Sequence, residues 1–100
     1  MAAYVIFQIH ASHNQDALQA YRKAAHPTIA AHQGRVLVAR GKQKTLEGKA
    51  PAETVVLEFA SYEAALGWYE SEAYQEVLKL RLHAADVDAY VVDGFAPKPA

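Results

Sequence analysis

The sequence predicts an α+β fold in which secondary-structure elements follow the order strand, helix, strand, strand, helix, strand. Three observations support this prediction. The chain has 100 residues, which suits one domain. Runs rich in β-branched and aromatic residues alternate with two stretches whose apolar residues recur at helical spacing. The first of these runs is apolar on both of its faces, which indicates a sheet that is covered on both sides.

The first strand and the first helix are predicted from residues 4–34. Residues 4–9, Tyr-Val-Ile-Phe-Gln-Ile, have the composition of a strand. Asn14 is a favourable N-cap for the helix that follows, and the apolar positions of that helix recur at Leu18, Tyr21, Ala25 and Ile29. Pro27 lies inside this stripe and removes a backbone donor, so we expect a kink or a restart near His26. Gly34 is the expected C-terminal cap.

The remaining elements are predicted from the same kinds of signal. They are a strand at 35–40, a polar connection at 41–51, a strand at 53–59, a helix that Ser61 caps and that breaks and restarts at residues 70–72, and a last strand at 88–94. Residues 95–100 contain two prolines and form a short tail, so the predicted domain covers residues 1–94.

This order of elements is the split βαβ, or ferredoxin-like, arrangement. Its two crossovers place both helices on one face of an antiparallel sheet. Alternation places Val5, Phe7 and Ile9 on one face of the sheet and Tyr4 and Ile6 on the other, so the open face is apolar as well. Because nothing else in the chain can cover these apolar residues, we expect a homodimer that pairs through the open sheet face.

Composition excludes several classes of function. The net charge is −1, the pI is about 6.5 and basic residues are scattered, so the sequence does not predict a nucleic-acid-binding protein. The absence of cysteine excludes disulfides, a thiol nucleophile and Cys-ligated zinc. No segment approaches the roughly 20 apolar residues of a membrane span. The N-terminus has no charged leader or cleavage pattern, so the expected location is the cytoplasm.

The sequence also resembles a known family over residues 4–94. The most specific pieces are Leu57-Glu58-Phe59 and the run Trp68-Tyr69-x-Ser71-x-x-Tyr74. These resemble the domain of unknown function thirteen-thirty family, which belongs to the dimeric α/β-barrel superfamily. The resemblance implies a ferredoxin-like fold whose two sheets pair into a barrel across a dimer axis. It implies no particular activity, since the superfamily includes cofactor-free monooxygenases, muconolactone isomerases and haem-binding members.

Glu58 and Arg40 are the candidate catalytic residues. Glu58 lies between two apolar residues of a core strand, where an unpaired carboxylate would cost several kcal/mol. Arg40, at the end of the neighbouring strand, is the expected partner by topology. The pair is interpreted either as a positioned acid or base at a cleft between sheet and helices, or as a structural ion pair that fixes the strand register.

Tyr69, Trp68, Tyr21 and His10 are the candidate substrate-binding residues. An aromatic pair beside a helix break would line a flat pocket, and Tyr21 lies on the apolar stripe of the first helix. A role in the core is the alternative for each aromatic residue, and for a residue placed like Tyr21 it is the more common one. No metal ligand and no cofactor are predicted, although two weaker alternatives are a site that joins His10 with Glu58 and haem ligation by His83.

Two functions are consistent with these residues. The first is a cofactor-free homodimeric enzyme that binds a small apolar organic acid or carbonyl compound. The second is a non-catalytic dimeric ligand-binding or accessory module. An Arg40–Glu58 pair facing an open cavity would favour the enzyme, whereas a closed, dry pair would favour the accessory module.

Overall fold

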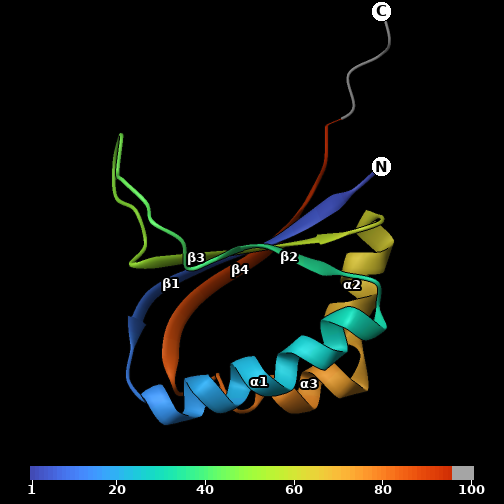
Figure 1. Ribbon diagram of the computed structural model, residues 1–100, viewed down its shortest axis with the longest axis horizontal. Coiled ribbons are helices and arrows are strands. Elements are labelled where there is room, and N and C mark those ends of the chain that lie inside the picture. Colours follow the sequence, from blue (N-terminus) through green and yellow to red (C-terminus); the bar gives the residue numbers. More distant parts are fainter. Residues whose placement is uncertain (96–100) are drawn as a thin grey trace, which may run out of the picture.

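A four-stranded antiparallel sheet carries three helices on one of its faces (Figure 1). The computed structural model describes residues 1–95, so most of the predicted tail at 95–100 lies outside the described residues. The strand order is β2-β3-β1-β4, as the ferredoxin-like prediction requires. In chain order the elements are β1 (Ala3–Ser12), α1 (Gln15–Ala31), β2 (Arg35–Ala39), β3 (Glu53–Phe59), α2 (Tyr62–Glu70), α3 (Glu72–Leu78) and β4 (Ala85–Asp93).

Side-chain caps begin all three helices. The Asn14 side chain accepts a hydrogen bond from the Ala17 amide, and Ser61 accepts one from the Ala64 amide. Ser71 ends α2 and begins α3, since its hydroxyl accepts from the Tyr74 amide. The predicted N-caps Asn14 and Ser61 and the predicted break at residues 70–72 are therefore confirmed.

The end of α1 differs from its prediction in two ways. The helix runs through Pro27 to Ala31 without a restart, because the residues around the proline are buried against the rest of the fold. The left-handed position that follows the helix belongs to Gln33 (φ 56°), and the Gly34 amide donates to the Ile29 carbonyl at 2.9 Å. A glycine follows because a Cβ at Gly34 would lie 2.5 Å from the buried Phe59 ring.

The core lies between the sheet and the helices. Trp68, Tyr74 and Phe59 are its largest fully buried side chains. The Trp68 ring packs against the Tyr74 and Phe59 rings with centroid distances of 4.1 and 5.3 Å. Val5 and Phe7 of β1 both face this cluster, and the alternation in the sequence predicts that they share a face.

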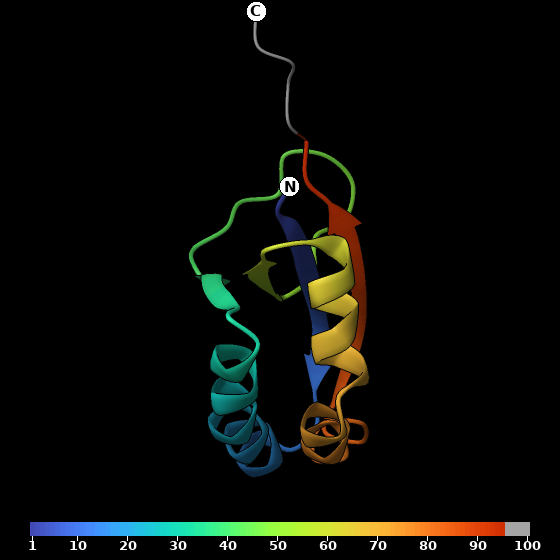
Figure 2. The ribbon, with the colours of Figure 1, turned by 90° about the vertical axis from the view of Figure 1, so that its right-hand side faces the viewer.

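The opposite face of the sheet carries no helix (Figure 1). Ile6 is paired there with Val56 of β3 and Tyr90 of β4, and these apolar side chains are exposed or half-exposed. The connection between β2 and β3 extends from the sheet on the same side. Beneath the sheet, Figure 2 shows α1 on one side and α2 with α3 on the other.

Candidate functional site

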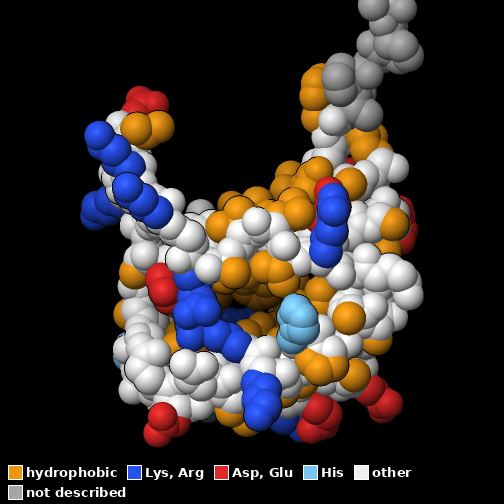
Figure 3. Space-filling view, viewed as in Figure 1, with side chains coloured by type: hydrophobic (Ala, Val, Ile, Leu, Met, Phe, Trp, Pro, Cys, Tyr) orange, Lys and Arg blue, Asp and Glu red, His pale blue; other side chains and the backbone are white. Residues whose placement is uncertain are grey.

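A cavity of about 240 Å³ lies between α1 and the sheet. Figure 3 shows it as a hollow with hydrophobic side chains inside and basic side chains at its border. Helix α1 packs against α3 and lies away from the strands, which leaves this space between α1 and the sheet. Most of the lining is apolar: Phe7, Ile9, Leu18, Ala25, Ile29, Val36, Ala39, Val55, Leu57, Trp68 and Val87. Tyr21 and four basic side chains complete it.

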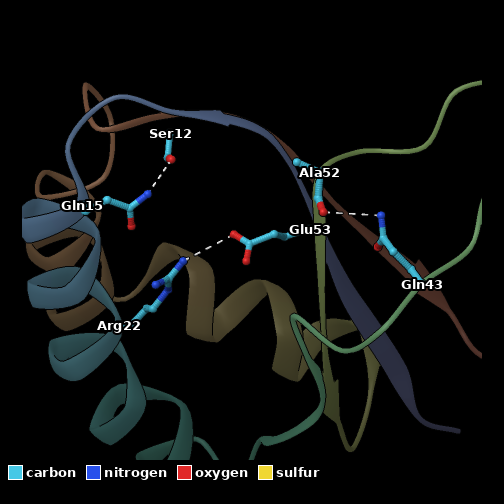
Figure 4. Close-up of polar contacts among 6 residues, drawn as sticks. All are labelled: Ser12, Gln15, Arg22, Gln43, Ala52 and Glu53. Carbon is cyan, nitrogen blue, oxygen red and sulfur yellow. Dashed lines mark hydrogen bonds and ion pairs between the residues drawn. The ribbon is translucent and has the colours of Figure 1, made fainter.

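Two arginines from different elements lie together at this cavity. Arg22 of α1 points toward Glu53 of β3, with 3.7 Å between Nη2 and Oε1 (Figure 4). Burial lowers the pKa of Arg22, and the positive charge of Arg40 lowers it further. Arg40 follows β2 in a left-handed conformation (φ 58°) and is exposed. His26, also from α1, adds an imidazole to the lining.

Arg81 is the buried cation of the cavity. The residue is only 8% exposed, and its guanidinium lies 5.5 Å from the Phe7 ring centroid and 5.3 Å from that of Tyr21. Its Nε is buried without a hydrogen-bond partner, and no carboxylate of residues 1–95 forms an ion pair with it. Burial lowers the pKa of Arg81, but the Tyr21 and Tyr74 hydroxyls outweigh this effect and raise it. The side chain therefore stays charged.

Two tyrosine hydroxyls lie beside this guanidinium. The Tyr21 and Tyr74 oxygens are 2.7 Å apart and share one hydrogen bond. Burial raises the pKa of Tyr74, and the neighbouring Tyr21 raises it further, so the Tyr74 phenol is neutral near pH 7. Only Tyr21 lines the cavity, while Tyr74 lies behind it in the core.

Two successive hydrogen bonds hold the Trp68 ring in place at the cavity. The Trp68 indole Nε1 donates to the Thr28 hydroxyl at 3.0 Å, and that hydroxyl donates to the Ala25 carbonyl at 2.6 Å. Both Trp68 and Thr28 are buried. The indole ring that lines the cavity is thereby fixed relative to α1.

Sequence comparison places the protein in a family. The family model described as a domain of unknown function (DUF1330) matches residues 2–95. The chain belongs to the DUF1330 family. No curated protein matches its sequence.

Solved structures similar to this DUF1330 protein share its fold. The RPA0582 protein of unknown function from Rhodopseudomonas palustris is 18% identical, with a TM-score of 0.74 over 96% of this chain and 84% of that one. SnoaB, a cofactor-independent oxygenase from Streptomyces nogalater, is 8% identical, with a TM-score of 0.68 over 99% and 98%. A dimeric ferredoxin-like protein of unknown function from Thermobifida fusca is 13% identical, with a TM-score of 0.63 over 93% and 91%. At these identities the likeness shows the fold alone.

The cavity brings together three of the residues that the sequence singled out, namely Tyr21, Arg40 and Trp68. The Tyr69 ring packs against the Trp68 ring, with 6.3 Å between the ring centroids. Tyr69 lines a different, smaller hollow of about 150 Å³ between α2 and β4. His10 lies at an irregularity of β1, where its Nε2 pairs with the Asp88 carboxylate at 3.0 Å. Neither residue lines the larger cavity.

The prediction that Arg40 pairs with Glu58 is wrong. Glu58 accepts a 2.6 Å hydrogen bond from Arg35, its neighbour across the β2–β3 ladder. The reason is alternation along β3: Leu57 and Phe59 face the helices, so the carboxylate between them faces the opposite side of the sheet. Arg40 instead lines the cavity on the helix side, and the two residues do not form one site.

Arg81, Arg22 and His26 are the lining residues that sequence reasoning missed. A signal for Arg81 was present, because it follows Leu78 by three residues on the apolar side of the last helical stretch. Within residues 1–95, no three His, Asp or Glu side chains gather as a metal site would require. None of the described helices is long and apolar enough to cross a membrane.

Proposed function

We propose that this DUF1330 protein binds a small, largely apolar organic acid or carbonyl compound in the cavity between α1 and the sheet. The observation that carries this proposal is an apolar cavity of about 240 Å³ with a few convergent polar groups, which is the usual character of a small-molecule site. Phe7, Trp68 and Tyr21 supply aromatic surface for the body of the ligand. Arg40 and Arg22 supply positive charge that would orient a polar group.

Binding is the function that these residues support best. Glu58, the carboxylate proposed as a base, points to the other face of the sheet and is paired there, so we leave it and His10 out of the site. The fold is shared with a cofactor-independent oxygenase, which keeps cofactor-free catalysis as a second candidate. A proton transfer at this cavity would fall to the Tyr21 hydroxyl or the His26 imidazole, the titratable lining groups that are not arginines.

The test uses Trp68, the only tryptophan of the chain, as a probe of the cavity. Benzoate and acetophenone represent the two ligand classes. We expect at least one of them to shift the Trp68 indole resonance in a ¹H–¹⁵N spectrum, and we expect Ala39→Phe, which narrows the cavity, to weaken that shift. Leu46→Phe, a change in the exposed connection between β2 and β3, is the matched control. If neither compound shifts the resonance at millimolar concentration, the proposal fails.

For the open sheet face we propose a second copy of the chain as partner. Two solved structures with this fold are dimeric proteins, and the face carries apolar residues around an Arg35–Glu58 pair. Burying Ile6, Val56 and Tyr90 against a partner would remove apolar surface from water at about 25 cal/mol per Å². Native mass spectrometry is expected to give a dimer for the wild type and a monomer for Ile6→Glu. A monomeric wild type would refute this assignment.

A further inference from the structure

We infer that the ligand is a carboxylate with an apolar body, and that its carboxylate lies deep in the cavity at Arg81 and Tyr21 rather than at the mouth. This inference rests on the proposed function and narrows it. It selects an acid over a neutral carbonyl compound, and it fixes the direction in which the ligand enters.

Arg81 is a buried cation without a counter-ion. Transfer of an ionised group out of water costs several kcal/mol even after relaxation, and proteins offset that cost by pairing the charge. The partners of Arg81 are the faces of two aromatic rings and two tyrosine hydroxyls, and none of them is a carboxylate. Its Nε–H has no acceptor at all. A ligand carboxylate beside the guanidinium would supply the missing negative charge.

The tyrosine pair leaves one donor for the same ligand. Two phenols carry two hydroxyl hydrogens, and the single bond between Tyr21 and Tyr74 uses one of them. Tyr21 is the member of the pair that lines the cavity. When Tyr74 donates to Tyr21, the Tyr21 hydrogen is free to donate to an oxygen bound at Arg81. The guanidinium and the phenol then form a two-donor site for one carboxylate.

The other basic side chains fit an anion less well. Arg22 already has the Glu53 carboxylate at 3.7 Å, which satisfies part of its charge. Arg40 is exposed, so water and salt screen its attraction for an anion. Both belong to the mouth of the cavity, where they would attract an acid without holding it. Arg81 combines burial, charge and an unused donor.

The experiment compares an acid with its neutral amide. Benzoate and benzamide have nearly the same shape, so a difference in their affinities reports the charge of the head group. Affinities are measured by titration of the Trp68 indole resonance in the wild type and in four variants: Arg81→Met, Tyr21→Phe, Arg22→Gln and Arg40→Gln. The Arg81 Nε–H resonance of the wild type is followed in the same titrations, because a carboxylate bound beside the guanidinium changes it.

We expect benzoate to bind more tightly than benzamide and to shift the Arg81 Nε–H resonance. Arg81→Met is expected to weaken benzoate binding about 10- to 100-fold, the range for a hydrogen bond to a charged group, and to leave benzamide unchanged. Tyr21→Phe is expected to produce a smaller loss, and Arg22→Gln or Arg40→Gln a loss of about threefold or less.

Each contrary result overturns a different statement. If neither benzoate nor benzamide binds, this inference fails, and the proposed function fails with it when acetophenone also leaves the Trp68 resonance unmoved. If both bind equally, the cavity is a binding site but the ligand class is wrong. If Arg40→Gln or Arg22→Gln abolishes the preference for benzoate while Arg81→Met keeps it, the carboxylate lies at the mouth. Should Arg81→Met fold poorly, an Arg81 Nε–H resonance that benzoate leaves unmoved in the wild type overturns the inference by itself.

Discussion

Thr28→Val tests whether one buried hydroxyl fixes the wall of the cavity. Valine has nearly the same shape as threonine but cannot accept the hydrogen bond that the Trp68 indole donates at 3.0 Å. Because Trp68 is fully buried, its N–H would lose its acceptor without gaining water. An unsatisfied buried donor costs about 1–3 kcal/mol, so we expect the free energy of unfolding to fall by about 2 kcal/mol. For a domain of this size that corresponds to a decrease in Tm of about 10 °C.

The assay is urea unfolding followed by the fluorescence of Trp68. Thr28→Ser is the matched variant, since it keeps the hydroxyl and removes one methyl group, at a cost of about 1 kcal/mol. In the valine variant we also expect weaker benzoate binding, because the indole is no longer fixed against α1. A valine variant within about 0.5 kcal/mol of the wild type would refute the reasoning, and so would a serine variant that loses as much as valine.

Two further predictions concern the core around this site. Gly34→Ala should lower the free energy of unfolding by about 1–3 kcal/mol, because the new Cβ would lie 2.5 Å from the Phe59 ring. The control Gly67→Ala, at a helical position with open space around it, should raise the free energy of unfolding by up to about 1 kcal/mol. Equal effects of the two variants in urea unfolding would contradict the packing argument. The free energy of unfolding should also fall above about pH 10, because the pKa of Tyr74 is raised in the folded state. As the pH rises, the unfolded chain loses the Tyr74 proton first. The stabilisation by protonated Tyr74 is therefore complete below the unfolded-state pKa and is lost at higher pH. Tyr74→Phe should make this decline shallower, whereas the control Tyr62→Phe, at an exposed position, should leave it unchanged.

Local signals in the sequence determined the order of elements. Asn14, Ser61 and Ser71 each provide a hydroxyl or amide oxygen where a helix begins, and all three caps are present in the structure. Alternation along β1 correctly grouped Val5 and Phe7 on one face of the sheet. These features depend on neighbours in the chain, and so they can be predicted without knowledge of the fold.

Only the tertiary structure decided which polar residues meet. Glu58 lies in β3 and Arg40 follows the adjacent β2, yet alternation turns the Glu58 side chain away from the helices while Arg40 lines the cavity on the helix side. Applying the same alternation to Glu58 that was applied to β1 would have corrected that prediction. The site at Arg81, by contrast, is assembled from β1, α1 and the turn after α3. Sequence alone placed Arg81 on an apolar side of the helical stretch. That Arg81 has no carboxylate beside it could be seen only once distant segments were packed together, because an ion pair depends on neighbours in space.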